Sequence, residues 1–186
     1  VHHQGQFGDF EDKKGDDLLQ ISEKKNLLIV QIVQFKNSKI PIESIDIDGL
    51  KLKDTSLNVT FDENTRILWN GPKNWLLVSS KKDLIKKISL TCKETDFAVT
   101  DLSHSRAVIE IEGNYVLEVL KKGSPFNFDI LKKNNSMNSL YNNIAFTVDL
   151  LNDKPFKVRL FTLRSFGESL YHSITDASLE FGYENK

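Results

Sequence analysis

The sequence is poor in residues that build covalent or metal-linked frameworks. It contains one cysteine, Cys92, which excludes an internal disulfide and a thiolate zinc cluster and fits a reducing compartment. The longest apolar run, Leu27–Val33, is interrupted by Gln31 and is far shorter than the roughly 20 residues that a membrane helix needs. No signal-peptide pattern precedes it. We therefore expect a cytoplasmic protein that does not contact a membrane.

An excess of charge of one sign is also missing. The 25 Lys and Arg nearly balance the 26 Asp and Glu, giving a net charge of -1. No overall field draws the chain to nucleic acid, so we expect no nucleic-acid partner. Arginine is scarce against lysine, and each arginine offers a planar fork for bidentate hydrogen bonds that lysine lacks. The arginines are Arg66, Arg106, Arg159 and Arg164.

Motifs for cofactor binding are absent as well. The sequence has neither a GxGxxG fingerprint nor a Walker-type loop, so we expect no FAD or NAD in this chain. We also expect no catalytic residue and no metal ligand. Asp101, Ser103 and His104 superficially supply a hydrolase triad, but His104 would point to the opposite side of a strand. Local hydrogen bonds that fix a strand end explain these residues better.

The patterns that are present predict one domain of mixed class. Residues 1–25 are polar and glycine-containing, which predicts a flexible tail, and residues 26–186 should form a single domain that its length allows to be bilobed. Strand patterns occupy Leu27–Phe35, Arg66–Trp69, Trp75–Val78, Phe97–Asp101, Ala107–Glu112, Ile144–Leu150 and Phe156–Leu160. We expect residues 36–53 to be irregular.

Three segments have the spacing of amphipathic helices. One follows a capping box at Ser80 and Asp83, one runs from Asn114 to Gly123, and the last follows a second box at Ser165 and Glu168. Hairpins with separated helices predict an α+β fold, with a mainly antiparallel sheet and packed helices.

Trp69 and Trp75 flank the turn at Gly71. Their rings could stack on a planar ligand such as a pterin or flavin, or pack in a core or an interface. Both alternatives remain open from the sequence.

Three segments, taken together and in order, resemble the gamma-subunit family of heterotetrameric sarcosine oxidase. They are Leu68–Val78 (LWNGPKNWLLV), Asp101–Ile109 (DLSHSRAVI) continuing through Gly113 to Pro125, and Arg164–Leu170 (RSFGESL). Ser124, Gly167 and Tyr171 depart from the cysteine, alanine and tryptophan that are usual in the family. The DLSH segment is also similar to the folate-binding aminomethyltransferase group, the T-protein of glycine cleavage.

The resemblance implies the fold of the aminomethyltransferase folate-binding domain and a place in a four-subunit oxidoreductase. The partners would be the alpha, beta and delta subunits, which carry FAD, FMN, NAD, tetrahydrofolate and zinc. The complex would oxidatively demethylate sarcosine to glycine with tetrahydrofolate as one-carbon acceptor. This chain would be its structural and assembly component, with Arg106, Arg164, Trp69 and Trp75 as candidate subunit contacts.

Two other functions remain as alternatives. The DLSH segment and the paired tryptophans would suit a small stand-alone folate-binding protein of the aminomethyltransferase type. An independent hydrolase using His104 is the weaker alternative, because its candidate residues are adjacent rather than convergent.

Overall fold

The computed structural model describes residues 18–186, and the chain divides into two compact units. Unit 1 takes in residues up to 25, then 106–133 and 138–186, whereas unit 2 takes in residues 26–105 and 134–137. Unit 2 is therefore inserted between the first strand of unit 1 and the rest of that unit. No helix within residues 18–186 is long and apolar enough to cross a membrane.

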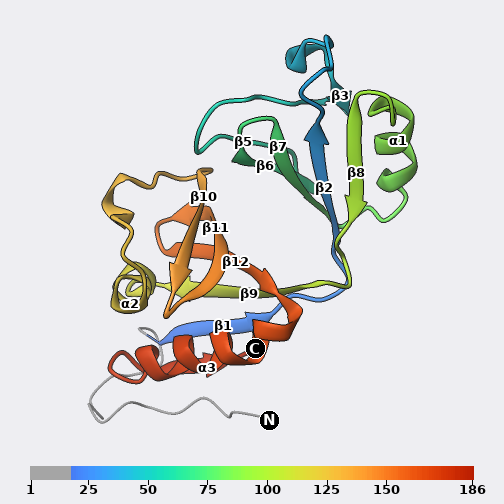
Figure 1. The fold of residues 1–186 in the computed structure, drawn as a ribbon. Helices are drawn as coiled ribbons and strands as arrows, with labels where there is room; N and C mark the ends of the chain where they lie inside the picture. Colours follow the sequence, from blue (N-terminus) through green and yellow to red (C-terminus); the bar gives the residue numbers. More distant parts are fainter. Residues whose placement is uncertain (1–17) are drawn as a thin grey trace. The chain divides into compact units, whose positions relative to one another are not determined.

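Unit 1 is built on a six-stranded sheet in the order β10-β11-β12-β9-β1-β13 (Figure 1). The ladders of β9 with β1 and β12, and of β11 with β12, are antiparallel, whereas β1 and β13 pair in parallel. The strands are β1 (Leu19–Glu23), β9 (Arg106–Gly113), β10 (Ser136–Tyr141), β11 (Ile144–Asp153), β12 (Phe156–Leu163) and β13 (Tyr183–Asn185).

Two helices cover one face of this sheet. They are α2 (Val116–Gly123) and α3 (Gly167–Ser178), accompanied by short 3-10 turns η3 (Phe128–Ile130) and η4 (Arg164–Phe166). Ile21 of β1 and Ile111 of β9 are ladder partners on neighbouring strands. Both side chains are fully buried, and so is that of Leu170 in α3. Each aliphatic side chain removed from water in this way contributes about 2 kcal/mol, so the helix-covered face is the core of unit 1.

Glu110 carries a network of charges on β9. Its carboxylate lies 2.9 Å from Arg159, 3.1 Å from Lys157 and 3.3 Å from Lys24. Burial alone would raise the pKa of Glu110, but hydrogen bonds from Arg159 and Lys157 outweigh it and hold the pKa below its ordinary value. Three cations from β12 and the residues after β1 thus keep one buried carboxylate ionised.

Unit 2 is a five-stranded antiparallel sheet in the order β5-β6-β7-β2-β8, with a small β3-β4 hairpin beside it. Helix α1 (Leu84–Thr91) packs on one face through Leu84 and Ile88. Its strands are β2 (Leu28–Gln34), β3 (Asp46–Ile47), β4 (Leu50–Lys51), β5 (Val59–Phe61), β6 (Thr65–Gly71), β7 (Asn74–Ser79) and β8 (Phe97–Asp101), and η2 spans Ile42–Ser44.

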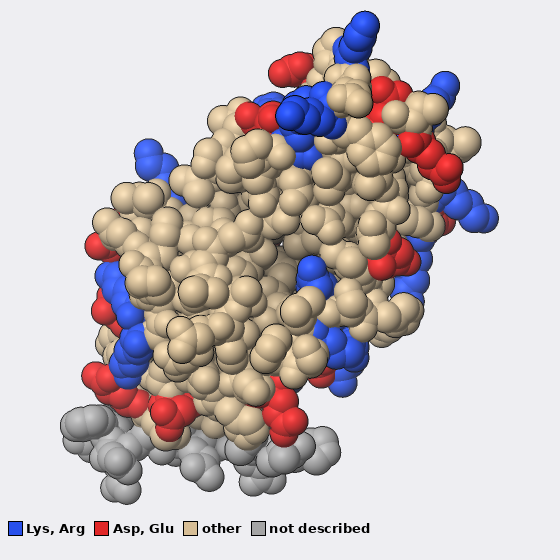
Figure 2. Space-filling model, in the orientation of Figure 1, with Lys and Arg blue, Asp and Glu red and all other residues tan. Residues whose placement is uncertain are grey.

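These elements confirm the α+β class and the mainly antiparallel sheets. The predicted hairpins are β6-β7 and β11-β12, and the predicted strands at Phe97 and Ala107 are β8 and β9. Residues 36–53, expected to be irregular, contain η2, β3 and β4. Charges of both signs are interspersed on the face drawn in Figure 2, as the balanced composition suggests.

The expected tail boundary at residue 25 is wrong for the residues that follow position 17. Leu19 and Ile21 are fully buried in β1, whose ladder partners are β9 and β13. The strand is held by partners about 90 and 160 residues away in the chain, so its own few residues carry no local signal. Residues 1–17 lie outside the described part of the chain.

Neither predicted capping box forms. The Ser80 hydroxyl donates to Asn64 at 3.1 Å, while α1 begins after Asp83 without a side-chain cap. Ser165 lies inside η4, and the N–H of Gly167 is bonded to the carbonyl of Arg164. A 3-10 turn that runs directly into α3 satisfies N–H groups that a cap would otherwise serve.

Candidate subunit-contact site

The DLSH segment forms a hydrogen-bonded clasp at the end of β8. The Ser103 hydroxyl donates to Asp101 Oδ1 at 2.6 Å, and the Ser103 N–H donates to the same oxygen at 2.9 Å. These two bonds, the hydroxyl first, lower the pKa of Asp101. His104 is exposed and takes no part in them. The local-bonding interpretation is confirmed, because serine and aspartate fix the strand end.

Arg106 begins β9 directly after this clasp. Its side chain is half-buried, and burial lowers the pKa of its guanidinium. Among residues 18–186, no carboxylate and no other side chain forms a hydrogen bond or ion pair with that guanidinium. Removing a charge from water without a partner costs free energy, so Arg106 is suited to a carboxylate from outside the chain.

Two large apolar side chains accompany Arg106. Leu163, opposite Arg106 in the β9-β12 ladder, is 44% exposed, and Phe166 in η4 is 47% exposed. Between them in sequence, Arg164 directs a guanidinium N–H to the Arg106 carbonyl at 3.5 Å. We call Arg106, Leu163, Arg164 and Phe166 the arginine corner. Apolar anchors beside arginines are the composition typical of the centre of a protein interface.

A close contact holds the arginine corner in place. Gly167, which follows Phe166, lies so near β9 that a Cβ added to it would come within 2.7 Å of the Ala107 Cβ. Glycine is therefore required if the start of α3 is to approach the strand this closely. This contact could not be read from the sequence, in which Gly167 is notable only because it replaces the alanine that is usual in the resembled family.

The two tryptophans have different environments in unit 2. Trp75 is 1% exposed, and its indole N–H donates to the Lys53 carbonyl at 2.9 Å. The structure thus places Trp75 in the core instead of at a contact, because its ring has no exposed surface. Trp69 is half-buried, and its indole N–H donates to Asp54 at 2.8 Å. Asp54 also accepts the N–H of Lys73, which ties Trp69 to the hairpin turn.

The sequence did not indicate Leu163 and Phe166 as site residues. The alternating pattern of β12 ends near Leu163, and an apolar residue before a helix is usually assigned to a core. Over the described part of the chain, no group of three or more His, Cys, Asp or Glu could hold a metal ion. Cys92 is buried, and burial raises the pKa of its thiol to about 11, so it is protonated at neutral pH.

Comparison with known proteins defines the fold class. No family model and no curated protein matches the sequence. The structure, however, is similar to a chain of heterotetrameric sarcosine oxidase from Corynebacterium sp. U-96, solved in complex with pyrrole 2-carboxylate. The TM-score is 0.81 at 22% sequence identity, and the match covers 90% of this chain and 87% of that one.

A second similar structure is the glycine cleavage system aminomethyltransferase T from Bartonella henselae. Its TM-score is 0.60 at 10% identity, over 85% of this chain. The match spans only 45% of that enzyme, so this chain corresponds to about half of it. The relation that the sequence resemblance predicted, to sarcosine oxidase and to aminomethyltransferases, is confirmed at the level of the fold.

Proposed function

We propose that this chain is the gamma subunit of a heterotetrameric sarcosine oxidase and that it serves as a structural and assembly component. The observation that carries the proposal is the similarity to a sarcosine oxidase chain over nearly the full length of both. The match covers 90% of this chain and 87% of that one, which is what the proposed correspondence between the two chains requires. The three sequence segments that resemble the gamma-subunit family support the same assignment.

The arginine corner supplies a means of contact. In the proposed complex, a carboxylate of a partner subunit pairs with Arg106 while apolar partner side chains cover Leu163 and Phe166. Arg106 then gains the partner that it lacks among the described residues, and two exposed apolar side chains leave water. Arg164 adds a second cation to the corner. Trp69, half-buried on unit 2, is a further contact candidate.

In this proposal the partner subunits carry out the chemistry of the complex. The alpha, beta and delta subunits carry FAD, FMN, NAD, tetrahydrofolate and zinc, and the assembled complex demethylates sarcosine to glycine in the cytoplasm. This chain contributes no catalytic residue. Its role is to cover part of the surface of the partner subunits and to hold the cofactor-carrying subunits in position.

Co-expression tests the assignment. A tagged form of this chain is expressed with the candidate alpha, beta and delta subunits encoded beside it, captured by its tag, and scanned for flavin absorbance. We expect a yellow complex that produces hydrogen peroxide from sarcosine. Recovery of the colourless chain alone, from cells in which the other three subunits are soluble, would contradict the proposal.

A stand-alone folate-binding protein is the second candidate, favoured by the similarity to aminomethyltransferase T. Fluorescence titration of the isolated chain with tetrahydrofolate separates the two. Quenching of Trp69 with saturation would support the folate-binding candidate.

A further inference from the structure

A row of side chains crosses one end of the unit 1 sheet, with one residue from each of four neighbouring strands. Arg106 of β9 and Leu163 of β12 are ladder partners. The pairing of Phe146 with Thr162 puts the next residue of β11, Ala145, beside Leu163. β10 follows β11 in the strand order (Figure 1) and contributes the fourth residue. We call these residues the end row: Arg106, Leu163, Ala145 and Leu140.

Leu140 belongs to the row because of the register of the β10-β11 hairpin. The two strands are joined by a two-residue turn at 142–143. Thr147 of β11 donates its hydroxyl to Asn138 Oδ1 of β10 at 2.6 Å, so these two residues lie side by side. In an antiparallel hairpin, two positions further along β10 face two positions further back on β11. Leu140 therefore lies beside Ala145.

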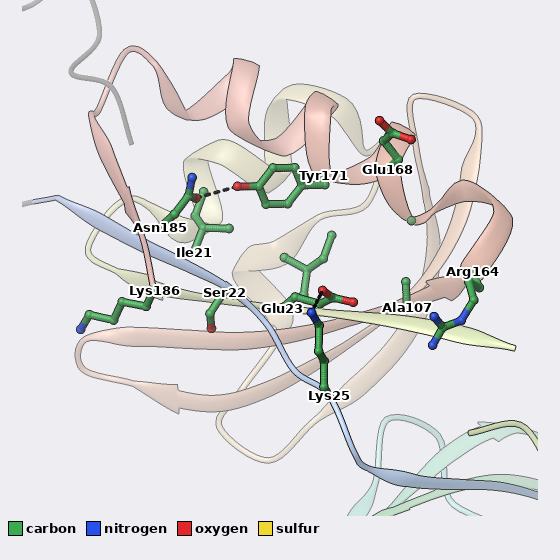
Figure 3. A pocket seen from close by; sticks show the side chains of 12 residues that line it. Ile21, Ser22, Glu23, Lys25, Ala107, Arg164, Glu168, Tyr171, Asn185 and Lys186 are labelled. Atoms are coloured by element: carbon green, nitrogen blue, oxygen red, sulfur yellow. Dashed lines mark hydrogen bonds and ion pairs between the residues drawn. The ribbon is translucent and has the colours of Figure 1, made fainter. Parts of the chain in front are cut away.

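The end row lies on the face of the sheet opposite α2 and α3. Tyr141, which follows Leu140, donates its hydroxyl to the Val119 carbonyl of α2 at 3.0 Å. Because successive side chains of a strand point to opposite faces, Leu140 points away from α2. On the helix-covered face, α3 is bonded to β13 by the hydrogen bond from Tyr171 to Asn185 at 2.6 Å (Figure 3). That face is occupied by the chain's own elements, and the end row points to the other one.

The end row is apolar along most of its length and cationic at one end. Leu140 is 45% exposed, Leu163 is 44% exposed, and Ala145 between them is also exposed. Exposed apolar side chains that adjoin one another are typical of protein interaction sites. At the β9 end, the half-buried Arg106 guanidinium has no hydrogen bond or ion pair with any described residue. A complementary partner must supply apolar side chains and a carboxylate at the Arg106 end.

The spacing of the row favours a helix over an extended segment. Neighbouring strands lie roughly 4.8 Å apart, so Leu163 and Leu140, two strands apart, are separated by about 9.6 Å. Successive turns of an α-helix rise about 5.4 Å, so two turns span about 10.8 Å. In an extended segment, side chains on one face are about 6.7 Å apart, so two steps span about 13 Å and exceed the row.

We propose that the end row binds an amphipathic helix of a partner subunit, with an acidic residue at the end of the helix that lies over Arg106. Apolar side chains of the helix, two turns apart, cover Leu163 and Leu140. Ala145 is small, which leaves room between the two leucines for a large side chain from the middle turn. This inference rests on the assembly role proposed above and names the kind of segment that the partner presents.

Capture of the co-expressed partner subunits tests the row. Leu140→Gln and Leu163→Gln should each weaken capture about fivefold, because each substitution loses about half of the transfer free energy of a leucine side chain. Leu90→Gln makes the same change at an exposed leucine of α1 and is the matched control, which should be captured as the unchanged chain is. Thermal unfolding verifies that each variant is folded.

The outcomes separate this inference from the assembly role. If the unchanged chain is captured and Leu140→Gln is captured equally well, the end row is refuted and the assembly role stands. If the unchanged chain captures no partner, both are refuted. A loss in Leu140→Gln and Leu163→Gln that Leu90→Gln does not share supports the row.

Photo-crosslinking within the complex tests for the helix. The photoreactive residue p-benzoylphenylalanine is placed at position 140 in one variant and at position 163 in another, and mass spectrometry identifies the cross-linked partner peptides. We expect both variants to react with one partner segment, at residues about seven apart, with Asp or Glu one turn beyond the residue that position 163 reaches. A separation of about three residues would indicate an extended segment. That result, or reaction with two unrelated segments, would overturn the proposal.

Discussion

The hydroxyl of Ser103 accepts a hydrogen bond from the backbone N–H of Ile29 at 3.0 Å, across 74 positions of the chain. The same hydroxyl donates to Asp101 at 2.6 Å. Ile29 lies just after the chain has entered unit 2, and Ser103 lies just before the chain leaves it. One serine therefore joins the incoming and outgoing segments, and this junction gives the Asp101 and Ser103 side chains of the DLSH motif a structural role.

Ser103→Ala should destabilise the chain by about 1–3 kcal/mol, because the N–H of Ile29 loses its acceptor and Asp101 loses a donor. Urea denaturation measures the change. His104→Ala, one position away and exposed, is the control and should stay within about 0.5 kcal/mol of the unchanged chain. The clasp would be refuted if the two variants were equally stable.

Arg106→Met should weaken capture of the partner subunits by about 2 kcal/mol, the loss expected when an arginine is removed from an interface centre. Arg106→Lys should recover part of that loss, since it keeps the charge but not the planar fork. Stability of the isolated chain should hardly change, because Arg106 has no partner among residues 18–186. Capture is measured by co-purification yield over a dilution series.

Arg66→Met is the control for the Arg106 variants. Arg66 lies over the Phe61 ring at 5.1 Å and donates to Asn134 at 3.2 Å, so its loss should reduce chain stability and leave capture intact. If Arg106→Met instead lowered stability and left capture unchanged, Arg106 would be a structural residue of the chain.

Gly123→Ala should destabilise unit 1 by about 1–3 kcal/mol. A Cβ at position 123 would come within 2.5 Å of the Tyr141 ring, which is buried and donates its hydroxyl to the Val119 carbonyl at 3.0 Å. Thermal unfolding followed by near-ultraviolet circular dichroism reports the change. Gly49→Ala has open space around it, so it carries only the cost of its positive φ and should be the milder variant. The reverse ranking would contradict the Tyr141 contact.

Asp48 makes stability depend on pH in the acid range. Hydrogen bonds from Lys87 at 2.6 Å and Lys81 at 2.9 Å lower the pKa of Asp48 from 3.8 to about 2. A folded-state pKa below the unfolded value stabilises the fold above pH 3.8, and that contribution is lost as pH falls toward 2. The stability difference between the unchanged chain and Asp48→Asn should therefore shrink over this interval. Urea denaturation at several pH values measures it, and a constant difference would refute the pairing.

The sequence predicted those elements whose signal is local. Alternating residue types predicted β9 and the β11-β12 hairpin as strands, although the middle residues of each, such as Val108–Ile111, are buried on both faces of the sheet and not on one. β1 and β13 were missed because they consist of 5 and 3 residues held by distant ladder partners. Gly123 ends α2 as the sequence predicted. The sequence did not predict that its lack of a side chain is also required by the Tyr141 ring, which lies 18 positions further along the chain.

The candidate site was predicted only in part. Arg106 and Arg164 were identified as rare arginines inside resembled segments, and both lie in the arginine corner. The exposure of Leu163 and Phe166 could not be predicted, because an apolar side chain gives the same pattern whether a core or solvent surrounds it. Trp75 was proposed as a contact on residue type alone, and only its burial distinguishes it from Trp69.

The insertion of unit 2 into unit 1 fixes an order of events during synthesis. β1 leaves the ribosome before unit 2, but both of its ladder neighbours, β9 and β13, are made afterwards. All five strands of the unit 2 sheet lie within residues 26–105, so that sheet can close while β1 still has no neighbour. Cotranslational folding of this chain should therefore begin in its middle, with the buried residues of β1 exposed to chaperones until β9 emerges.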